Sequence, residues 1–249
     1  MSDLDGKTVL VTGASKRIGR SLAVKLAKQG ANIVVHYNTS KEEALQTREE
    51  VAKQGVKVHL VKADLSKPES SSRLIEEALT KAGGLHGLIN NASVFKRRGV
   101  GEANIRELEA DMMINAWAPF LLSREFGRRV GRGKIINILD TRIAGYDFDN
   151  FPYYLSKKML ETLTRSLALQ LSPEVTVNAV APGLILPPVG RGLDHLERLK
   201  EKVPLKRYGS VEDVTEAVLF LLKSNFITGQ IIYVDGGKHL VQAVEGLIP

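Results

Sequence analysis

The chain is predicted to have an α/β fold, with a doubly wound, mainly seven-stranded parallel sheet and helices on both of its faces. Short runs rich in β-branched residues predict the strands, at residues 8–12, 31–36, 56–61, 87–90, 134–139, 175–180 and 231–234. Segments with helical spacing separate these runs, and the alternation continues from end to end. No linker, repeat or low-complexity tract divides the 249 residues, so a single domain over residues 1–249 is expected.

The individual elements follow from local patterns. Each strand run is almost continuously apolar, so each strand is expected to be buried, as in a parallel sheet covered on both faces. Pro and Gly residues interrupt the pattern after residue 182, which predicts a substrate loop around residues 184–200 over the ligand site. Helices are indicated by apolar residues three or four positions apart, as in Ile18-Leu22-Leu26, Leu74-Ala78, Met159-Leu163-Leu167-Leu171 and Val214-Val218-Leu221.

The composition argues against several kinds of site. The chain has no Cys, and its 5 His residues lack ligand spacing, so neither a disulfide nor a metal site is expected. The formal charge of +7 would suit nucleic acid, a membrane surface or a phosphorylated small molecule. The basic residues are dispersed and no aromatic residues interleave with them, so a small molecule is favoured. Without a signal peptide or a long apolar run, the protein is expected to be cytoplasmic, with no nucleic-acid or membrane partner.

A glycine turn follows the first strand. Residues 12–19 read Thr-Gly-Ala-Ser-Lys-Arg-Ile-Gly and run into a helix that is expected to begin near Arg17. Gly13 permits the tight turn, Gly19 permits close packing of the helix on the sheet, and the free N–H groups of the helix suit a pyrophosphate. An ordinary glycine turn is the alternative, but the position after the first strand predicts a Rossmann-type nucleotide site.

The residues after the second strand indicate which nicotinamide cofactor is bound. NAD-binding folds carry a carboxylate about 20 residues beyond the glycine turn, where it bonds the ribose hydroxyls. Residues 36–40 read His-Tyr-Asn-Thr-Ser instead, and no carboxylate there would repel a 2′-phosphate. Lys16 and Arg17 are available to pair with that phosphate, although both could simply be surface charges. NADPH is therefore the expected cofactor.

A pair of residues with acid–base chemistry lies in the longest helical pattern. Tyr153 and Lys157 are four residues apart, so both side chains lie on one helix face. A nearby ammonium is expected to lower the pKa of the tyrosine and to prepare it for proton transfer. Tyr154 and Lys158 have the same spacing, so the geometry alone leaves the choice between the two pairs open.

Taken together, these motifs resemble the short-chain dehydrogenase/reductase family over nearly the whole chain. The resemblance rests on residues 12–13, 90–92, 115, 153–157, 182–183, 227–230 and 234–237. In that family Ser or Ala precedes the lysine, which implies that Tyr153 and Lys157 are the catalytic pair. The resemblance also implies that Asn115 supports a proton relay through Lys157. It further implies a homotetramer, with apolar residues 240–241 and 244–249 packed between subunits.

The resemblance implies a cofactor site made of many residues. Asp64 and Leu65 would lie by the adenine, Asn90 and Ala92 along the cofactor, and Pro182 and Gly183 against the nicotinamide. The complete implied set is Gly13, Ser15, Lys16, Arg17, Ile18, Gly19, His36, Tyr37, Asn38, Ser40, Asp64, Leu65, Asn91, Ala92, Ser93, Lys157, Pro182 and Gly183.

Two departures from the family pattern are informative. Arg17 replaces the middle glycine of the turn, and Asp140 replaces the serine found thirteen residues before the tyrosine. Both departures are similar to the pteridine reductase branch, as are His36-Tyr37 and residues 90–95, Asn-Asn-Ala-Ser-Val-Phe. This likeness implies NADPH-dependent reduction of a pterin or dihydropterin, with Tyr153 as proton donor aided by Asp140. The implied substrate residues are Arg17, Ser93, Phe95, Asp140 and Tyr153.

Two other functions stay open. An NADPH-dependent keto-reductase of 3-oxoacyl-carrier-protein or a small carbonyl compound would have Asp140 as an isolated substitution, and basic residues 96–98 and 128–129 could receive an acidic carrier protein. A non-catalytic Rossmann protein that senses nucleotides or binds nucleic acid is the other alternative, since fold does not imply function. The presence of both Tyr153 and Lys157 argues against the latter.

Overall fold

The structure, a computed structural model, describes residues 4–245, and of residues 242–245 the backbone alone. Seven strands form one sheet in the order β3-β2-β1-β4-β5-β6-β7, and every neighbouring pair is parallel. The prediction of a seven-stranded parallel sheet is confirmed. The strands are β1 (Thr8–Val11), β2 (Asn32–Tyr37), β3 (Val58–Lys62), β4 (Gly87–Asn90), β5 (Gly133–Ile138), β6 (Val175–Pro182) and β7 (Ile231–Val234).

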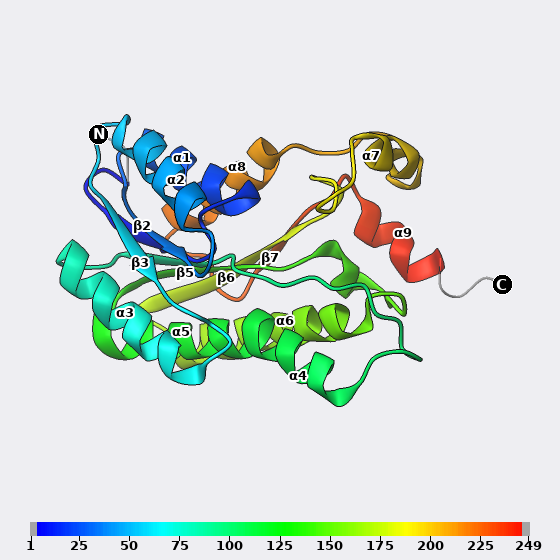
Figure 1. Cartoon of the computed structure of the whole chain (residues 1–249), viewed down its shortest axis with the longest axis horizontal. Helices are drawn as coiled ribbons and strands as arrows, with labels where there is room; N and C mark the ends of the chain where they lie inside the picture. The colour runs from blue at the N-terminus through cyan, green and yellow to red at the C-terminus, as the bar shows by residue number, and fades with distance from the viewer. Residues whose placement is uncertain (1–3, 246–249) are drawn as a thin grey trace.

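Helices cover both faces of the sheet, as predicted. Figure 1 shows α1, α2 and α8 on one face and α3, α5 and α6 on the other. The helices are α1 (Arg17–Lys28), α2 (Lys41–Ala52), α3 (Pro68–Ala82), α4 (Ile105–Met112), α5 (Ala118–Val130), α6 (Phe151–Gln170), α7 (Asp194–Leu199), α8 (Val211–Lys223) and α9 (Lys238–Glu245). Shorter helical turns are η1 (Met113–Trp117, π), η2 (Thr141–Ala144, 3₁₀) and η3 (Lys200–Lys202, 3₁₀).

Two large apolar clusters, one on each face of the sheet, and a smaller one around Leu160 of α6 hold these layers together. On one face, Leu22 and Leu26 of α1 pack with Val214 and Val218 of α8. On the other face, residues of α3 and α5 pack against the opposite side of the same strands, with Phe126 fully buried. Because strand side chains alternate between faces, each central strand contributes to both cores, which explains its almost unbroken apolar sequence.

The expectation that every strand is buried was wrong at the two edges. All four residues of β7 are only partly buried, and in β3 Val61 alone is fully buried. Each of these strands has a neighbour on one side only, so fewer side chains cover it than cover the central strands.

The order of the strands positions the site. Connections from β1 run outward through β2 and β3, whereas those from β4 run the other way through β5 to β7, so the direction of winding changes between β1 and β4. A crevice forms at the carboxyl ends of the strands at such a point, because the following loops diverge. In Figure 1, α7 and α9 lie at this end of the sheet.

The predicted substrate loop is only partly irregular. Residues 184–193 have no helix or strand, but residues 194–202 form α7 and η3. Of the carboxyl-terminal residues expected between subunits, Leu240 is exposed, whereas 246–249 lie outside the described residues. Among residues 4–245, no helix combines the length and the apolar character needed to cross a bilayer.

Candidate active site

The glycine turn after β1 is as tight as the sequence indicates. Gly13 has φ +61°, and a Cβ on it would lie 2.9 Å from the Cα of Ala92. A Cβ on Gly19 would collide with the carbonyl oxygen of Gly13, so α1 can approach the turn only because residue 19 lacks a side chain. The first turn of α1 has no side-chain cap, which leaves its N–H groups directed at the crevice.

His36 supports this turn from behind. Its Nδ1 accepts a hydrogen bond of 3.1 Å from the Gly13 N–H, and its Nε2 lies 3.1 Å from the carbonyl oxygen of Ala63. The ring is therefore neutral, with Nε2 as the donor, and burial lowers the pKa of His36 to about 4. Both ring nitrogens are engaged by the backbone, so His36 holds the nucleotide turn in shape and does not itself face the crevice.

Arg17 occupies the glycine position in a glycine conformation. Its φ is +53°, in the left-handed region that costs a non-glycine residue about 1–2 kcal/mol. Its guanidinium donates a hydrogen bond of 2.8 Å to the carbonyl oxygen of Pro187. This strained residue therefore links the glycine turn to the substrate loop.

The residues expected around the 2′-phosphate gather beyond β2. Lys16 forms an ion pair of 2.6 Å with Glu43 of α2, and Asn38 lies 3.4 Å from Asp64. Residues 36–40 contain no carboxylate, as expected from the sequence. A carboxylate is nevertheless close by, because Glu43 contacts Lys16. Ser40 precedes α2, and the remaining members of the expected set, Ser15, Tyr37 and Leu65, are buried.

Thr12 ties the ends of β1 and β4 together. Its Oγ1 accepts hydrogen bonds from the N–H groups of Asn91 and Ala92, at 2.9 and 3.0 Å, and donates to Ile89. The Asn91 side chain donates in turn to the carbonyls of Thr12 and Gly13. The expected place of Asn90 along the cofactor was wrong, because Asn90 is buried and bonds Asn137 at 2.8 Å inside the sheet.

Asn115 fixes the segment after β4. It lies in the π-helical turn η1, where its Oδ1 accepts from Ser93 Oγ and Val94 N at 3.0 and 2.9 Å. Its Nδ2 donates to the Val94 carbonyl and to Ser156 of α6. Among the described residues these bonds do not reach Lys157, so Asn115 acts in this structure as a positioning residue for Ser93 and its neighbours.

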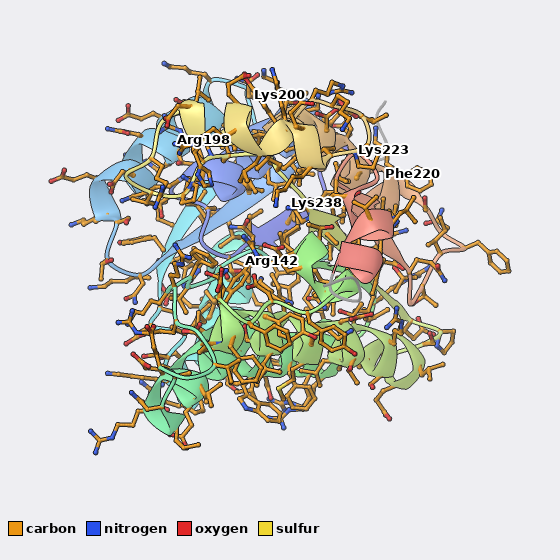
Figure 2. All side chains as sticks on the ribbon, turned by 90° about the vertical axis from the view of Figure 1, so that its right-hand side faces the viewer. Arg142, Arg198, Lys200, Phe220, Lys223 and Lys238 are labelled. Atoms are coloured by element: carbon orange, nitrogen blue, oxygen red, sulfur yellow. The ribbon has the colours of Figure 1, made fainter. Side chains whose placement is uncertain are left out.

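Asp140 lies at the centre of a chain of charged and polar groups. It follows β5 and begins η2, where its Oδ1 accepts from the Arg142 backbone N–H at 2.9 Å. Its Oδ2 accepts from both the Arg142 guanidinium, at 2.9 Å, and the Tyr153 hydroxyl, at 3.0 Å. Arg142 also pairs with Asp147 at 2.7 Å. Figure 2 views the crevice end of the molecule, with Arg142 near its centre.

Lys157 lies beneath Tyr153. It is 2% exposed, its Nζ donates to the carbonyl of Ile138 at 2.8 Å, and it lies 5.7 Å from the centre of the Tyr153 ring. Lys158, by contrast, bonds Glu161 and the Ile143 carbonyl. Of the two pairs that the spacing allows, only Tyr153 and Lys157 join the group around Asp140, as the resemblance implies.

The charge states in this group differ from expectation. Burial raises the pKa of Tyr153 well above its usual value, and the Asp140 carboxylate raises it further, while Arg142 opposes them. The expected net lowering of the pKa of Tyr153 was therefore wrong for this arrangement, because burial and the neighbouring carboxylate of Asp140 determine the direction of the shift. Burial also lowers the pKa of Lys157 to about 8, against the effect of Asp140. Tyr153 is thus a protonated donor at neutral pH.

Phe95 forms one wall beside the tyrosine. Its ring meets the Tyr153 ring edge to face, with centroids 4.8 Å apart, and the Arg142 guanidinium lies 5.5 Å from its centroid. Phe95 is 45% exposed, although a phenylalanine that follows a strand is more often part of the core. An exposed aromatic face next to a buried proton donor suits a flat heterocycle.

Pro182 and Gly183 close the site from β6. Pro182 ends that strand, and the Gly183 N–H donates to the carbonyl of Val234 at 2.9 Å. A Cβ on Gly183 would lie 2.5 Å from the Cβ of Asp235, so only glycine fits. Asp235 in turn accepts a hydrogen bond from Thr141, which anchors η2 beside Asp140.

Sequence reasoning missed Arg142 and Thr12. Arg142 is recognisable in retrospect as the cation two residues after Asp140 in a short helical turn, although its second partner, Asp147, depends on the fold. Thr12 belongs to the glycine motif, yet its bonds to residues 91 and 92 join chain segments that are distant in sequence. In residues 4–245, no group of three or more His, Cys, Asp or Glu side chains could hold a metal ion.

The crevice fits a dinucleotide. Gly13 and Gly19 leave a backbone surface that any larger side chain would fill, and the uncapped start of α1 suits a pyrophosphate. At the other end of the crevice lie a buried ammonium, Lys157, and the constrained Gly183. Most residues expected from the sequence therefore lie around the same end of the sheet. His36, Asn90 and Asn91 bond other parts of the protein and support this site from within.

Comparison with known proteins is consistent with this site. A family model described as Enoyl-(Acyl carrier protein) reductase matches residues 13–239. The 3-oxoacyl-[acyl-carrier-protein] reductase FabG of Aquifex aeolicus is 36% identical over 245 residues, which cover 94% of this chain and 98% of that protein.

Two solved structures are also similar to the chain. FolM Alternative dihydrofolate reductase 1 from Brucella suis, in complex with NADP, has a TM-score of 0.90 and 32% identity, and the match covers 95% of this chain and 96% of that chain. A blue fluorescent protein from a metagenomic library, in complex with NADPH, has a TM-score of 0.87 and 31% identity, with 95% and 99% covered.

Proposed function

The chain belongs to the short-chain dehydrogenase/reductase family, and from this premise we propose that it is an NADPH-dependent reductase of a pterin or dihydropterin. The observation that carries the proposal is the hydrogen bond between the Tyr153 hydroxyl and Asp140, at the position where keto-reductases have a serine. A serine hydroxyl donates to a carbonyl oxygen, whereas a carboxylate can only accept hydrogen bonds. Asp140 therefore suits a substrate that presents N–H groups, such as an aminopyrimidine ring.

The cofactor proposal rests on the glycine turn and on Lys16. Gly13, Gly19 and the start of α1 would hold the pyrophosphate, Lys16 would face the 2′-phosphate, and Lys157 would bond the nicotinamide ribose. NADPH supplies a hydride to a C=N carbon of the substrate when both are bound. The similar structures that contain NADP or NADPH support the choice of cofactor.

The chain's own residues supply the proton. Tyr153 remains protonated at neutral pH because burial and Asp140 raise its pKa, so it can donate its hydroxyl proton to the ring nitrogen. The ammonium of Lys157, on the same helix face, stabilises the resulting phenolate. Arg142 balances the charge of Asp140 and keeps the carboxylate in place for both the tyrosine and the substrate.

Phe95 would provide the stacking surface for the heterocycle. Its exposed ring lies beside Tyr153, so a flat ring packed against it would reach the hydroxyl. Ser93, held by Asn115, and Arg17, held by Pro187, border the same space from the strand and loop sides. The homotetramer implied by the resemblance and the cytoplasmic location expected from the sequence stay proposals, and light scattering would test the former.

A keto-reductase of 3-oxoacyl-carrier-protein is the second candidate, because relatives named FabG are up to 36% identical to this chain. The two functions differ in the assay. NADPH oxidation is followed with a 7,8-dihydropterin in one reaction and an acetoacetyl thioester in another. Turnover of the pterin alone supports the proposal, whereas turnover of the thioester alone overturns it and leaves the fold and Tyr153 unaffected.

A further inference from the structure

A cavity lies between α4, the start of α6 and the segment that follows Phe95. It has a volume of about 180 Å³ and is lined by three cations, Lys96, Arg98 and Arg106, and by Glu107, Asp111 and Pro152. Lys96 directly follows Phe95, and Pro152 directly precedes Tyr153. Phe95 and Tyr153 do not themselves line the cavity, but each is the chain neighbour of a residue that does, and the charge of Asp111 acts on the Tyr153 hydroxyl.

Asp111 makes this cavity unusual. The residue is 3% exposed, and its Oδ2 has no hydrogen-bond partner among the described residues. A buried polar atom without a partner is costly and uncommon in folded proteins, so it calls for a physical explanation. A hydroxyl or N–H group of a ligand in the cavity would satisfy this oxygen. Burial also raises the pKa of the Asp111 carboxyl.

The remaining charges favour an anion. Arg98 is engaged by Glu107 at 3.0 Å. No ion pair of Lys96 or Arg106 is found within the part of the chain whose side chains the structure describes, and both are exposed at the rim of the cavity. A ligand with a donor near Asp111 and a negative group near these two cations would match both features.

We propose that this cavity binds the side chain of the reduced heterocycle, and that this side chain carries a hydroxyl or N–H donor near the ring and an anionic group at its end. The inference rests on the proposed function, which places the ring at Phe95 and Tyr153. Since liquid water occupies about 30 Å³ per molecule, the volume of about 180 Å³ corresponds to about six water molecules, which leaves room for a short polyol chain. The phosphate or carboxylate would then lie at the rim.

The test compares four substrates by their kcat and KM. They are a 7,8-dihydropterin with a methyl side chain, one with a trihydroxypropyl side chain, the phosphate monoester of the latter, and dihydrofolate, whose tail ends in carboxylates. The variants are Lys96→Ala, Arg106→Ala and Asp111→Leu. Arg97→Ala is the matched control, because Arg97 lies in the same loop and carries the same charge but does not line the cavity.

Removal of Lys96 or Arg106 is expected to raise KM for one of the anionic substrates about tenfold more than for the methyl substrate, because a charge-assisted contact is lost. If KM rises for the phosphate monoester, the negative group is a phosphate. If it rises for dihydrofolate, the negative group is a carboxylate. Asp111→Leu is expected to raise KM for the hydroxylated substrates and also to raise Tm, since the unpartnered carboxyl is gone. Arg97→Ala should leave these ratios unchanged.

The two proposals fail in different ways. If no dihydropterin is turned over, the proposed function is overturned and the inference with it. If the methyl substrate is turned over but the ratios in Lys96→Ala and Arg106→Ala equal those in Arg97→Ala, the inference alone is overturned. If Asp111→Leu has a lower Tm than the native protein, Asp111 stabilises the fold. That result would contradict the inference that its carboxyl lowers stability and is kept for ligand binding.

Discussion

The two halves of the crevice satisfy their polar groups in different ways. In the nucleotide half, at the ends of β1 and β2, backbone groups pair with Thr12, His36 and Asn91, and each of these side chains is engaged within the protein. In the catalytic half, Asp140 is shared between Arg142 and Tyr153, and Lys157 is buried as a charged group. The first arrangement shapes a backbone surface that suits any dinucleotide. The second keeps charged groups buried at a cost in folding free energy, and a specific reaction can use these groups.

Replacing Tyr153 by Phe is expected to have the largest effect in the catalytic half. The phenyl ring keeps the contact with Phe95 but removes the donor, so kcat should fall about 10² to 10⁴-fold. Fluorescence titration with NADPH should give an unchanged Kd. A parallel loss of cofactor affinity would show that the two halves are not separate.

The buried ammonium of Lys157 is expected to support catalysis but to lower the stability of the fold. Burial lowers its pKa to about 8 from 10.5, so below pH 8 the folded protein bears the full cost of a buried ammonium, about 3 kcal/mol. This cost disappears as the pH rises from 8 to 10.5, because the unfolded chain then binds the additional proton. Lys157→Met should therefore raise Tm at pH 7, while kcat of the native enzyme should fall above pH 8.

The measurements are a pH profile of kcat for the native protein and thermal unfolding of the native protein and of Lys157→Met. The Met variant leaves the Ile138 carbonyl without its donor, which reduces the expected gain by about 1 kcal/mol. A Tm below that of the native protein at pH 7 would argue that Lys157 stabilises the fold.

His36 should give the nucleotide half its own pH dependence. Burial lowers its pKa to about 4 from 6.5, so the folded ring stays neutral while the unfolded ring is protonated below pH 6.5. The free energy of unfolding should thus decrease by about 3 kcal/mol between pH 6.5 and 4 because of this residue. Urea denaturation of the native protein and His36→Asn at pH 7 and pH 4 measures the difference; equal pH dependence in both would contradict the assignment.

Glu43 offers the smallest and most selective change. It pairs with Lys16 at 2.6 Å, on an exposed surface where such a pair contributes little to stability. Glu43→Gln should free Lys16 for the 2′-phosphate and lower the Kd for NADPH about two- to fivefold, with Tm unchanged. The Kd for NADH serves as the control. An equal improvement for both cofactors would place Lys16 away from the 2′-phosphate.

The sequence predicted the fold better than it predicted the site. Periodicity identified all seven strands and their common direction, because burial on both faces leaves a continuous apolar run. The motif after the first strand also identified Gly13 and Gly19, which shape the turn and the start of α1 next to it. The roles of His36 and Asn90 were assigned to the ligand surface, although both side chains bond other parts of the protein.

The errors in the catalytic half share one physical cause. A sequence motif gives the spacing of Tyr153 and Lys157 along a helix but not the solvent exposure of either group. Burial and the direction of the hydroxyl toward Asp140 reversed the expected shift in the pKa of Tyr153. Asp147 and Asp111 could not be recognised as neighbours of this pair, since their proximity depends on how η2 and α4 pack.

The central claim is that Asp140 selects a nitrogen heterocycle over a carbonyl substrate. The most direct test is the ratio of kcat/KM for a 7,8-dihydropterin to that for an acetoacetyl thioester, measured in the native protein and in Asp140→Ser. We expect a ratio that favours the pterin in the native protein and falls at least about 100-fold in the variant, because one charge-assisted hydrogen bond is replaced by a neutral donor. An unchanged ratio would contradict it.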